Sequence, residues 1–297
     1  MSRTRDGRQL SMMLAPYLVG LVALVFVPAL VTVAMSGTEW DLITAPRWVG
    51  AENFIELARS DAFRAALSNS LTFAVVAVPL RLALACGLAL LLQRRTRGVG
   101  AARTAALLPT AVPEVAYGLM WLWLLNPLYG PLNQLLTVGG ENGRTAWGTL
   151  PPQWLTDPQH ARAGIVLMSV FTMGEMLVIL LAARRALPAD CYALAALEGA
   201  RPWQVLRRVT LPLIAPVLAL LTLRDTIGSL QVSFVPALIV TDGGPPQYAT
   251  TYLSYFVYRN AFEYLRYGYA AAATVLMLLL TVAAVVAQWR LLRRMRW

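Results

Sequence analysis

The chain has 297 residues, of which 58% are hydrophobic and 13% charged, and its formal net charge is +10. Soluble domains carry roughly 25% charged residues, so the composition excludes a disordered chain and argues against a soluble globular one. All 25 basic residues are arginine, which excludes a lysine-dependent phosphate-binding loop and Schiff-base catalysis. With two cysteines and one histidine, we expect no metal site and no disulfide framework.

Six apolar stretches are long enough to cross a bilayer, which takes about 20 mainly apolar residues per helix. They cover approximately residues 11–35, 71–92, 104–125, 163–183, 211–240 and 268–289. The first follows basic residues as a signal peptide does, but it is too long for one, and we expect it to stay uncleaved. The fifth contains prolines and is too long for one straight helix, so it should tilt, bend or break. The sequence predicts an all-α integral membrane protein with one transmembrane domain over residues 1–297.

The arginines are distributed unevenly between the two sides of this arrangement. Sixteen lie in the two termini and in the segments 93–103 and 184–209, whereas the three opposite loops hold seven arginines and nine of the 15 acidic residues. Basic residues prefer the cytoplasmic side of a membrane. Both termini are therefore predicted to be cytoplasmic, and the positive charge indicates orientation, not nucleic-acid binding.

Two segments of the predicted outer loops have alternative interpretations. The segment 51–68 is either an amphipathic helix at the outer interface or a solvated loop helix. Seven of the 11 tyrosines fall between Tyr248 and Tyr269. They form either a docking surface for an external binding protein or an aromatic belt at the membrane interface.

Ionisable residues within the predicted spans are candidates for function, because charge is costly there. Arg224 and Asp225 give the fifth span a polar side. Pro109 and Pro113 predict a broken third span, which is tolerated only where protein or water covers the freed backbone and so favours a cavity there. The predicted translocation-pathway residues are Glu114, Tyr117, Glu175, Arg224, Asp225, Ser229 and Gln231. The alternative is an ion pair between Arg224 and either of these glutamates that only locks helices together. For Arg81 in the second span we favour a structural role.

The 184–209 segment is more than a short arginine-rich turn. Pro188 suits the first turn of a helix, and Asp190 suits its positive end. Gly199 can stop that helix, and Pro202 can start another. The pattern predicts two short helices outside the membrane, joined by a glycine bend, with small residues that can pack into a groove of another protein. The alternative is an interfacial helix pair with no partner.

This segment resembles the EAA loop of the membrane subunits of type I ABC importers. The matching residues, acidic equivalents included, are Pro188, Asp190, Tyr192, Ala195, Glu198, Gly199, Ala200, Trp203, Leu211 and Pro212. Weaker matches to the carbohydrate-permease subgroup follow in order over nearly the whole chain. They end with a periplasmic turn that contains Gly243, Gly244 and Pro245.

The chain also departs from the family's pattern. The signature glutamate is replaced by Ala193 and the next alanine by Leu194, which removes a charge-assisted contact with an ATPase subunit. Docking would then depend on shape, with charged residues such as Arg201 and Arg207 around it. The basic tail 290–297 lacks the glycine-rich ending of the second permease in such pairs, so the chain resembles the first, maltose- and glycerol-phosphate-type permease.

The resemblance implies a permease subunit that moves a sugar or sugar-like solute into the cytoplasm and has no catalytic residues of its own. It also implies a second, different permease, two nucleotide-binding subunits that carry ATP and Mg, and an extracytoplasmic solute-binding protein. The expected location is the lipid of the bacterial cytoplasmic (inner) membrane. The alternatives are a type I permease for a non-sugar solute, a stand-alone secondary transporter and, more distantly, an intramembrane enzyme.

Overall fold

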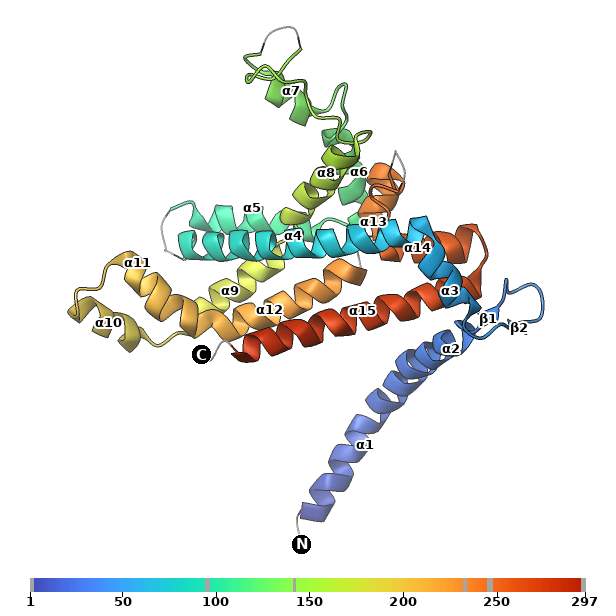
Figure 1. Cartoon of the computed structure of the whole chain (residues 1–297). Coiled ribbons are helices and arrows are strands. Elements are labelled where there is room, and N and C mark those ends of the chain that lie inside the picture. Colours follow the sequence, from blue (N-terminus) through green and yellow to red (C-terminus); the bar gives the residue numbers. More distant parts are fainter. Residues whose placement is uncertain (1–2, 94–96, 141–142, 232–233, 245–247, 295–297) are drawn as a thin grey trace. The chain divides into compact units, whose positions relative to one another are not determined.

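The computed structural model describes residues 3–93, 97–140, 143–231, 234–244 and 248–294 (Figure 1). The described residues form helices and one two-stranded antiparallel hairpin. The chain divides into two compact units. The first contains residues 1–61 and 256–279, and the second contains residues 62–255 and 280–297.

The first unit contains the N-terminal apolar helix and the loop that follows it. Its elements are α1 (Arg3–Leu21), a π-helical turn (Val22–Phe26), α2 (Val27–Met35), β1 (Thr38–Glu39), β2 (Arg47–Trp48), α3 (Glu52–Arg59), a second π-helical turn (Arg259–Glu263) and the beginning of α15 (Tyr267–Arg294). The apolar window of Met12–Met35 has no buried residue. This helix therefore offers a continuous apolar surface to lipid or to another protein.

The end of α2 is tied to α3 and to the beginning of α15. The Asn53 side-chain amide donates to the backbone oxygens of Ser36 and Thr38, at 2.9 Å each. The backbone N–H of Tyr267 donates to the Trp40 oxygen at 3.0 Å. At Gly268 a Cβ atom would overlap the Thr38 carbonyl oxygen, so this approach of two backbones requires glycine.

The second unit contains the remaining apolar helices. They are α4 (Asp61–Leu91), α5 (Val99–Ala111), α6 (Glu114–Leu124), α7 (Pro131–Thr137), α8 (Pro158–Val170), α9 (Gly174–Arg185), α10 (Ala189–Leu197), α11 (Pro202–Val205), a π-helical turn (Leu206–Thr210), α12 (Leu211–Gln231), α13 (Phe234–Pro236), a π-helical turn (Ala237–Thr241), α14 (Leu253–Tyr258) and the end of α15. Within this unit, α9 packs against both α5 and α12.

Two buried clusters of described residues help to hold the second unit together. An aromatic cluster joins α4, α6, α8 and the region around α14, and it includes Phe73, Tyr117, Trp121, Tyr252 and Tyr255. An aliphatic cluster joins α4, α9 and α12, and it includes Ala85, Leu177, Leu180 and Leu221. Edge-on ring packing, such as that of Phe73 on Tyr252 at 5.4 Å between centroids, adds about 0.5–1.5 kcal/mol to the burial of apolar area.

The tyrosine prediction is wrong for three residues of the 248–269 segment, because Tyr269 is buried as well as Tyr252 and Tyr255. Tyr252 and Tyr255 are both fully buried in the aromatic cluster, so they contribute to neither a docking surface nor an interfacial belt. Tyr255 lies on α14 (Leu253–Tyr258), and Tyr252 directly precedes that helix. Tyr248 and Tyr264 are exposed.

Four described helices are long and apolar enough to cross a membrane, and the number rises to six if each of two bent pairs is one span. The single helices are Met12–Met35, Asp61–Leu91, Pro202–Gln231 and Tyr267–Arg293. The pairs are α5 with α6, bent by 103°, and α8 with α9, bent by 43°. The break predicted in the third span is confirmed. It falls at Pro113, whose missing N–H costs no hydrogen bond just before a helix.

Two predicted segments have different boundaries in the structure. Residues 51–68 do not form one interfacial helix, because α3 ends at Arg59, Ser60 is extended, and α4 begins at Asp61. The carboxylate of Asp61 suits the positive end of the new helix. In the fifth span, α12 ends at Gln231 and a further helical segment begins at Phe234; residues 232–233 between them lie outside the described residues.

Candidate functional site

A cavity of about 720 Å³ lies among the helices of the second unit. Its lining includes six of the seven predicted pathway residues, namely Glu114, Tyr117, Glu175, Arg224, Asp225 and Ser229. Gln231 does not line it. Although Gln231 shares a helix face with Arg224, it lies about 10 Å further along α12, at 1.5 Å per residue. Ile227, an apolar residue of α12, lines the cavity beside these polar residues.

Two successive residues of α12 form ion pairs with two different helices. Arg224 Nη2 lies 2.7 Å from Glu175 Oε2 on α9, and these side chains are 58% and 57% exposed. Arg81 Nη2 on α4 lies 3.0 Å from Asp225 Oδ2, and these side chains are only 10% and 13% exposed. Arg81 also donates to Ser229 Oγ. Of the two partners considered for Arg224, the structure shows Glu175. The ion pair between Arg81 and Asp225 was not predicted.

The two ion pairs have different physical meanings. A charged pair that is exposed within a spanning helix must face water or protein, because hydrocarbon does not solvate it. The Arg224–Glu175 pair therefore marks a side of α12 that faces water or another protein. The Arg81–Asp225 pair joins α4 to α12 inside the unit, as the structural role favoured for Arg81 requires, yet both residues also line the cavity.

Glu114 is the first residue of α6, directly after the break at Pro113. It is exposed toward the cavity and has no ion-pair partner within the described part of the chain. The positive end of a helix stabilises a carboxylate at this position. Glu114 is thus an acceptor that a solute in the cavity could reach.

Tyr117 contributes to the wall of the cavity through its ring, and its hydroxyl is already used. The Tyr117 hydroxyl donates to the Met168 backbone oxygen at 2.6 Å, and this bond is buried. The bond ties α6 to α8. We therefore assign Tyr117 to positioning of the broken third span and not to hydrogen bonding of a solute.

Replacing Tyr117 by phenylalanine should lower the free energy of unfolding by about 0.5–1.5 kcal/mol, because one buried hydrogen bond between α6 and α8 is lost while the Met168 oxygen keeps the Phe171 N–H at 3.3 Å as a donor. Thermal unfolding in detergent measures this loss. Tyr129→Phe is the control, because Tyr129 is exposed. Equal stability of Tyr117→Phe and Tyr129→Phe would contradict the tie between α6 and α8.

Sequence reasoning missed several hydroxyl-bearing residues of the cavity, including Thr110, Ser169 and Thr172. Each hydroxyl donates to a backbone oxygen three residues earlier, at 2.6–2.7 Å. Such local bonds leave the oxygen lone pairs as acceptors. Nothing in the local sequence distinguishes these residues from hydroxyls elsewhere in the chain.

Helix α10 of the 184–209 segment ends in a turn that requires glycine. Gly199 has φ +69°. The N–H of Ala200 donates to the Ala195 oxygen at 2.9 Å, and the N–H of Gly199 donates to the Ala196 oxygen at 3.1 Å. These two bonds make a Schellman motif with Gly199 as its left-handed residue.

The second helix of this segment is longer than predicted. It begins at Pro202, where the backbone N–H of Arg201 donates to Gln204 Oε1 at 2.7 Å. It does not end before the fifth span but runs on through the π-helical turn into α12. The π turn widens the helix just before Pro212. It therefore accommodates the Pro212 ring, which in a regular α-helix would clash with the carbonyl group four residues earlier. The glycine bend therefore joins α10 directly to a spanning helix.

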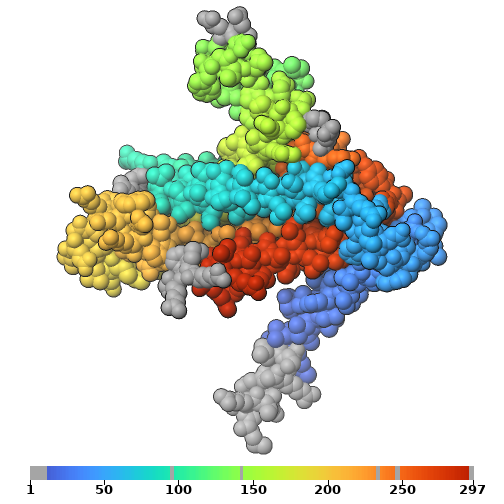
Figure 2. Space-filling model, viewed as in Figure 1, coloured from blue at the N-terminus to red at the C-terminus, as the bar shows by residue number. Residues whose placement is uncertain are grey.

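Contacts through Tyr192 hold α10 in place, while apolar side chains of this segment are open to the outside. The Tyr192 hydroxyl lies 3.1 Å from Thr210 Oγ1, and the Arg184 guanidinium lies 4.3 Å from the centre of the Tyr192 ring. Leu197 and Trp203 are 85% and 65% exposed. Figure 2 shows this segment, in yellow and gold, at one end of the second unit.

The predicted periplasmic turn is described up to Gly244, and Pro245 lies outside the described residues. Gly243 and Gly244 have φ values of +76° and +95°. A Cβ on Gly244 would lie 2.7 Å from the Thr250 nitrogen, so the turn needs glycine. The Tyr255 hydroxyl donates to Asp242 Oδ1 at 2.8 Å, which fixes the turn to the aromatic cluster.

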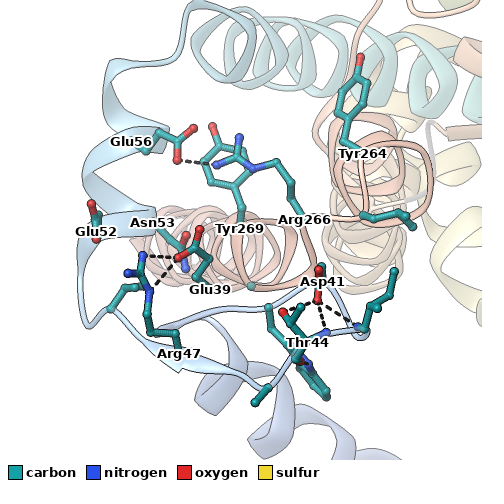
Figure 3. Close-up of a pocket in the computed structure, with 16 residues that line it drawn as sticks. Glu39, Asp41, Thr44, Arg47, Glu52, Asn53, Glu56, Tyr264, Arg266 and Tyr269 are labelled. Carbon is teal, nitrogen blue, oxygen red and sulfur yellow. Dashed lines mark hydrogen bonds and ion pairs between the residues drawn. The ribbon is translucent and has the colours of Figure 1, made fainter.

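The first unit contains a polar pocket of about 680 Å³ that the sequence did not indicate (Figure 3). Arg47 pairs with Glu39 across the hairpin, and Arg266 Nη2 lies 2.6 Å from Glu56 Oε2. Hydrogen bonds from Thr44 hold the pKa of Asp41 below its usual range. These charges join the two strands of the hairpin, hold the turn at Asp41, and tie α3 to the segment before α15.

Comparison with known proteins identifies the class to which this arrangement belongs. Residues 81–297 match the family described as "Binding-protein-dependent transport system inner membrane component". The chain belongs to this family, a transport component of membranes, which agrees with its apolar helices.

The similar proteins include curated relatives and solved structures. The trehalose/maltose transport system permease protein MalF of Thermococcus litoralis is 30% identical over 275 residues, which are 90% of this chain and 90% of that protein. The probable ABC transporter permease protein YesP of Bacillus subtilis is 29% identical, over 90% of this chain and 84% of that protein. The fold matches that of a bacterial ABC transporter involved in the import of the acidic polysaccharide alginate, with a TM-score of 0.80, 24% identity, and coverage of 99% and 98% of the two chains.

Proposed function

We propose that this chain is a transmembrane permease subunit of an ABC importer that moves a sugar or sugar-like solute into the cytoplasm. The observation that carries the proposal is the charged cavity. Arg224 and Glu175 lie within spanning helices and are more than half exposed, which is tolerated only beside water or protein. Carboxylate oxygens, guanidinium N–H groups and hydroxyls in one cavity suit a solute rich in hydroxyls. The relatives named for trehalose, maltose and starch products support a sugar.

The proposal includes several partners. The chain has no ATPase site of its own and works with a second, different permease, with two nucleotide-binding subunits that carry ATP and Mg, and with an extracytoplasmic solute-binding protein. Residues 1–297 act as one transmembrane domain in the bacterial cytoplasmic membrane, with both termini in the cytoplasm. The uneven distribution of arginine supports this orientation.

In this proposal the 184–209 segment meets an ATPase subunit. Ala193 replaces the family's signature glutamate, so the contact with the ATPase subunit is made instead by the exposed apolar side chains of Leu194, Leu197 and Trp203. ATP shifts the conformation only if it binds the outward-facing assembly better than the inward-facing one. The rigid turn at Gly199 would transmit this ATP-dependent change of conformation to α12, whose Arg224 and Asp225 line the cavity.

Replacing Leu197 by glutamate should weaken recovery of the ATPase subunit at least about tenfold, because burying a leucine side chain stabilises an interface by about 1.5–3 kcal/mol. Pull-down of the tagged chain from solubilised membranes, with the bound ATPase quantified, measures this. The matched control is Leu128→Glu, because Leu128 is 84% exposed in an outer segment and Leu197 is 85% exposed. The control should recover as much ATPase as the unmodified chain.

The same purification separates the proposal from a stand-alone secondary transporter. Recovery of an ATPase and a second permease with the chain supports the importer. A solitary chain that moves solute in vesicles without ATP would overturn it.

A further inference from the structure

An apolar groove of about 400 Å³ runs between α4 and α8 on the surface of the second unit. Its walls are bulky apolar side chains, namely Phe73, Val76 and Leu80 of α4 with Val166 and Val170 of α8. Val76 and Leu80 are exposed. The groove therefore presents an apolar surface at the depth of spanning helices.

The length of the groove corresponds to one leaflet. Along α4 it extends from Asn69 to Leu80, which is eleven steps, or about 16 Å at 1.5 Å per residue. The hydrocarbon core of a bilayer is about 30 Å thick, so one leaflet spans about 15 Å. A groove of this length matches a single acyl chain that enters from one side of the membrane.

The groove has one cationic end. Arg162, in the second turn of α8, lines it beside Asn69 and Tyr252. The Arg162 Nε donates to the Ala249 backbone oxygen at 3.0 Å, which orients the guanidinium. Within the described residues Arg162 has no carboxylate partner, and its side chain is exposed. A guanidinium suits the two-pronged binding of a phosphate.

We propose that this groove binds an anionic glycerophospholipid, with one acyl chain between α4 and α8 and the headgroup phosphate on Arg162. The orientation given under the proposed function places this lipid in the outer leaflet; the lipid site itself does not depend on transport. A packed helix of a partner fits the groove less well, because close helix packing in membranes uses small residues along the face, and bulky side chains dominate here.

Lipid binding to the complex, purified with the subunits that accompany the chain and then delipidated, tests the proposal. The probes are phosphatidylglycerol and phosphatidylcholine, titrated separately and counted by native mass spectrometry. Arg162→Gln should weaken binding of phosphatidylglycerol roughly tenfold, the effect expected for one lost charge-assisted contact, and should affect phosphatidylcholine less. Val76→Trp fills the groove and should abolish the bound copy of either lipid.

Two control variants match these changes outside the groove. Arg144→Gln removes an exposed outer arginine, and Val75→Trp places the same bulk on the neighbouring exposed position of α4. Both should retain the lipid. The proposal is overturned if Arg162→Gln binds phosphatidylglycerol as the unmodified complex does. It is equally overturned if Val76→Trp releases a partner subunit while lipid binding stays unchanged, because a protein helix would then occupy the groove.

Discussion

Replacing Gly199 by proline should lower solute-stimulated ATP hydrolysis of the assembled importer at least roughly fivefold, the lower end of typical coupling between sites. Gly199 has φ +69°, whereas proline fixes φ near −65°. Proline also lacks the N–H that donates to the Ala196 oxygen. The turn would open, and the orientation of α10 relative to the helix that leads into α12 would no longer be fixed. The measurement is ATPase activity in proteoliposomes with and without loaded binding protein.

Gly148→Pro is the matched control for this experiment. Gly148 has φ +76°, and its N–H donates to the Thr145 oxygen, so the backbone loses a comparable turn in an outer segment. We expect this variant to keep coupled hydrolysis, and both variants to reach the membrane in normal amounts. Unchanged stimulation in Gly199→Pro, or equal loss in the two variants, would contradict a specific role of the Gly199 turn in coupling.

Replacing Arg81 by leucine should destabilise the protein by about 3–5 kcal/mol, because Asp225 would remain buried without its partner. Replacing Arg224 by leucine should change the free energy of unfolding by no more than about 1 kcal/mol, because the Arg224–Glu175 pair is exposed. The Arg224 variant should instead lower solute uptake. Thermal unfolding of the purified protein and uptake into vesicles separate the two effects.

The double variant Arg81→Met with Asp225→Leu is the control for charge burial. Replacing a buried ion pair by apolar residues of similar volume is often neutral for stability, so the double variant should recover most of the stability lost in Arg81→Leu. Equal destabilisation by Arg81→Leu and Arg224→Leu would show that the two pairs do not differ in environment as their exposed fractions indicate.

Much of the fold could be predicted because membrane insertion is a property of local sequence. About 20 apolar residues suffice to define a spanning helix. The uneven distribution of arginine and the prolines Pro109 and Pro113 of the third span can also be read directly from the sequence. The boundary at Ser60 was missed, although a serine followed by Asp61 is a pattern typical of a helix start. The continuation of the Pro202 helix into α12 was likewise missed, since a π turn next to Pro212 leaves no clear mark in the sequence.

The candidate site was predictable by residue type and not by contact. The cost of charge in a membrane singled out Arg224, Asp225 and Glu175, and six of the seven pathway candidates line one cavity. Which arginine pairs with which carboxylate depends on helix rotation. From the sequence we could therefore predict an ion pair of Arg224 with either Glu114 or Glu175. We could not predict the pair that Arg81 forms with Asp225.

The sequence by itself determined that this chain is a multi-span membrane protein of a recognisable transport class, because composition, apolar length and motif order do not depend on packing. The tertiary structure decided which polar residues are interior ties and which stay exposed. Asp225 and Arg224 are neighbours on α12, and one is nearly buried against α4 while the other is exposed beside α9. Neighbouring residues of a helix point in directions about 100° apart, at 3.6 residues per turn, and only the positions of the surrounding helices give each direction its environment.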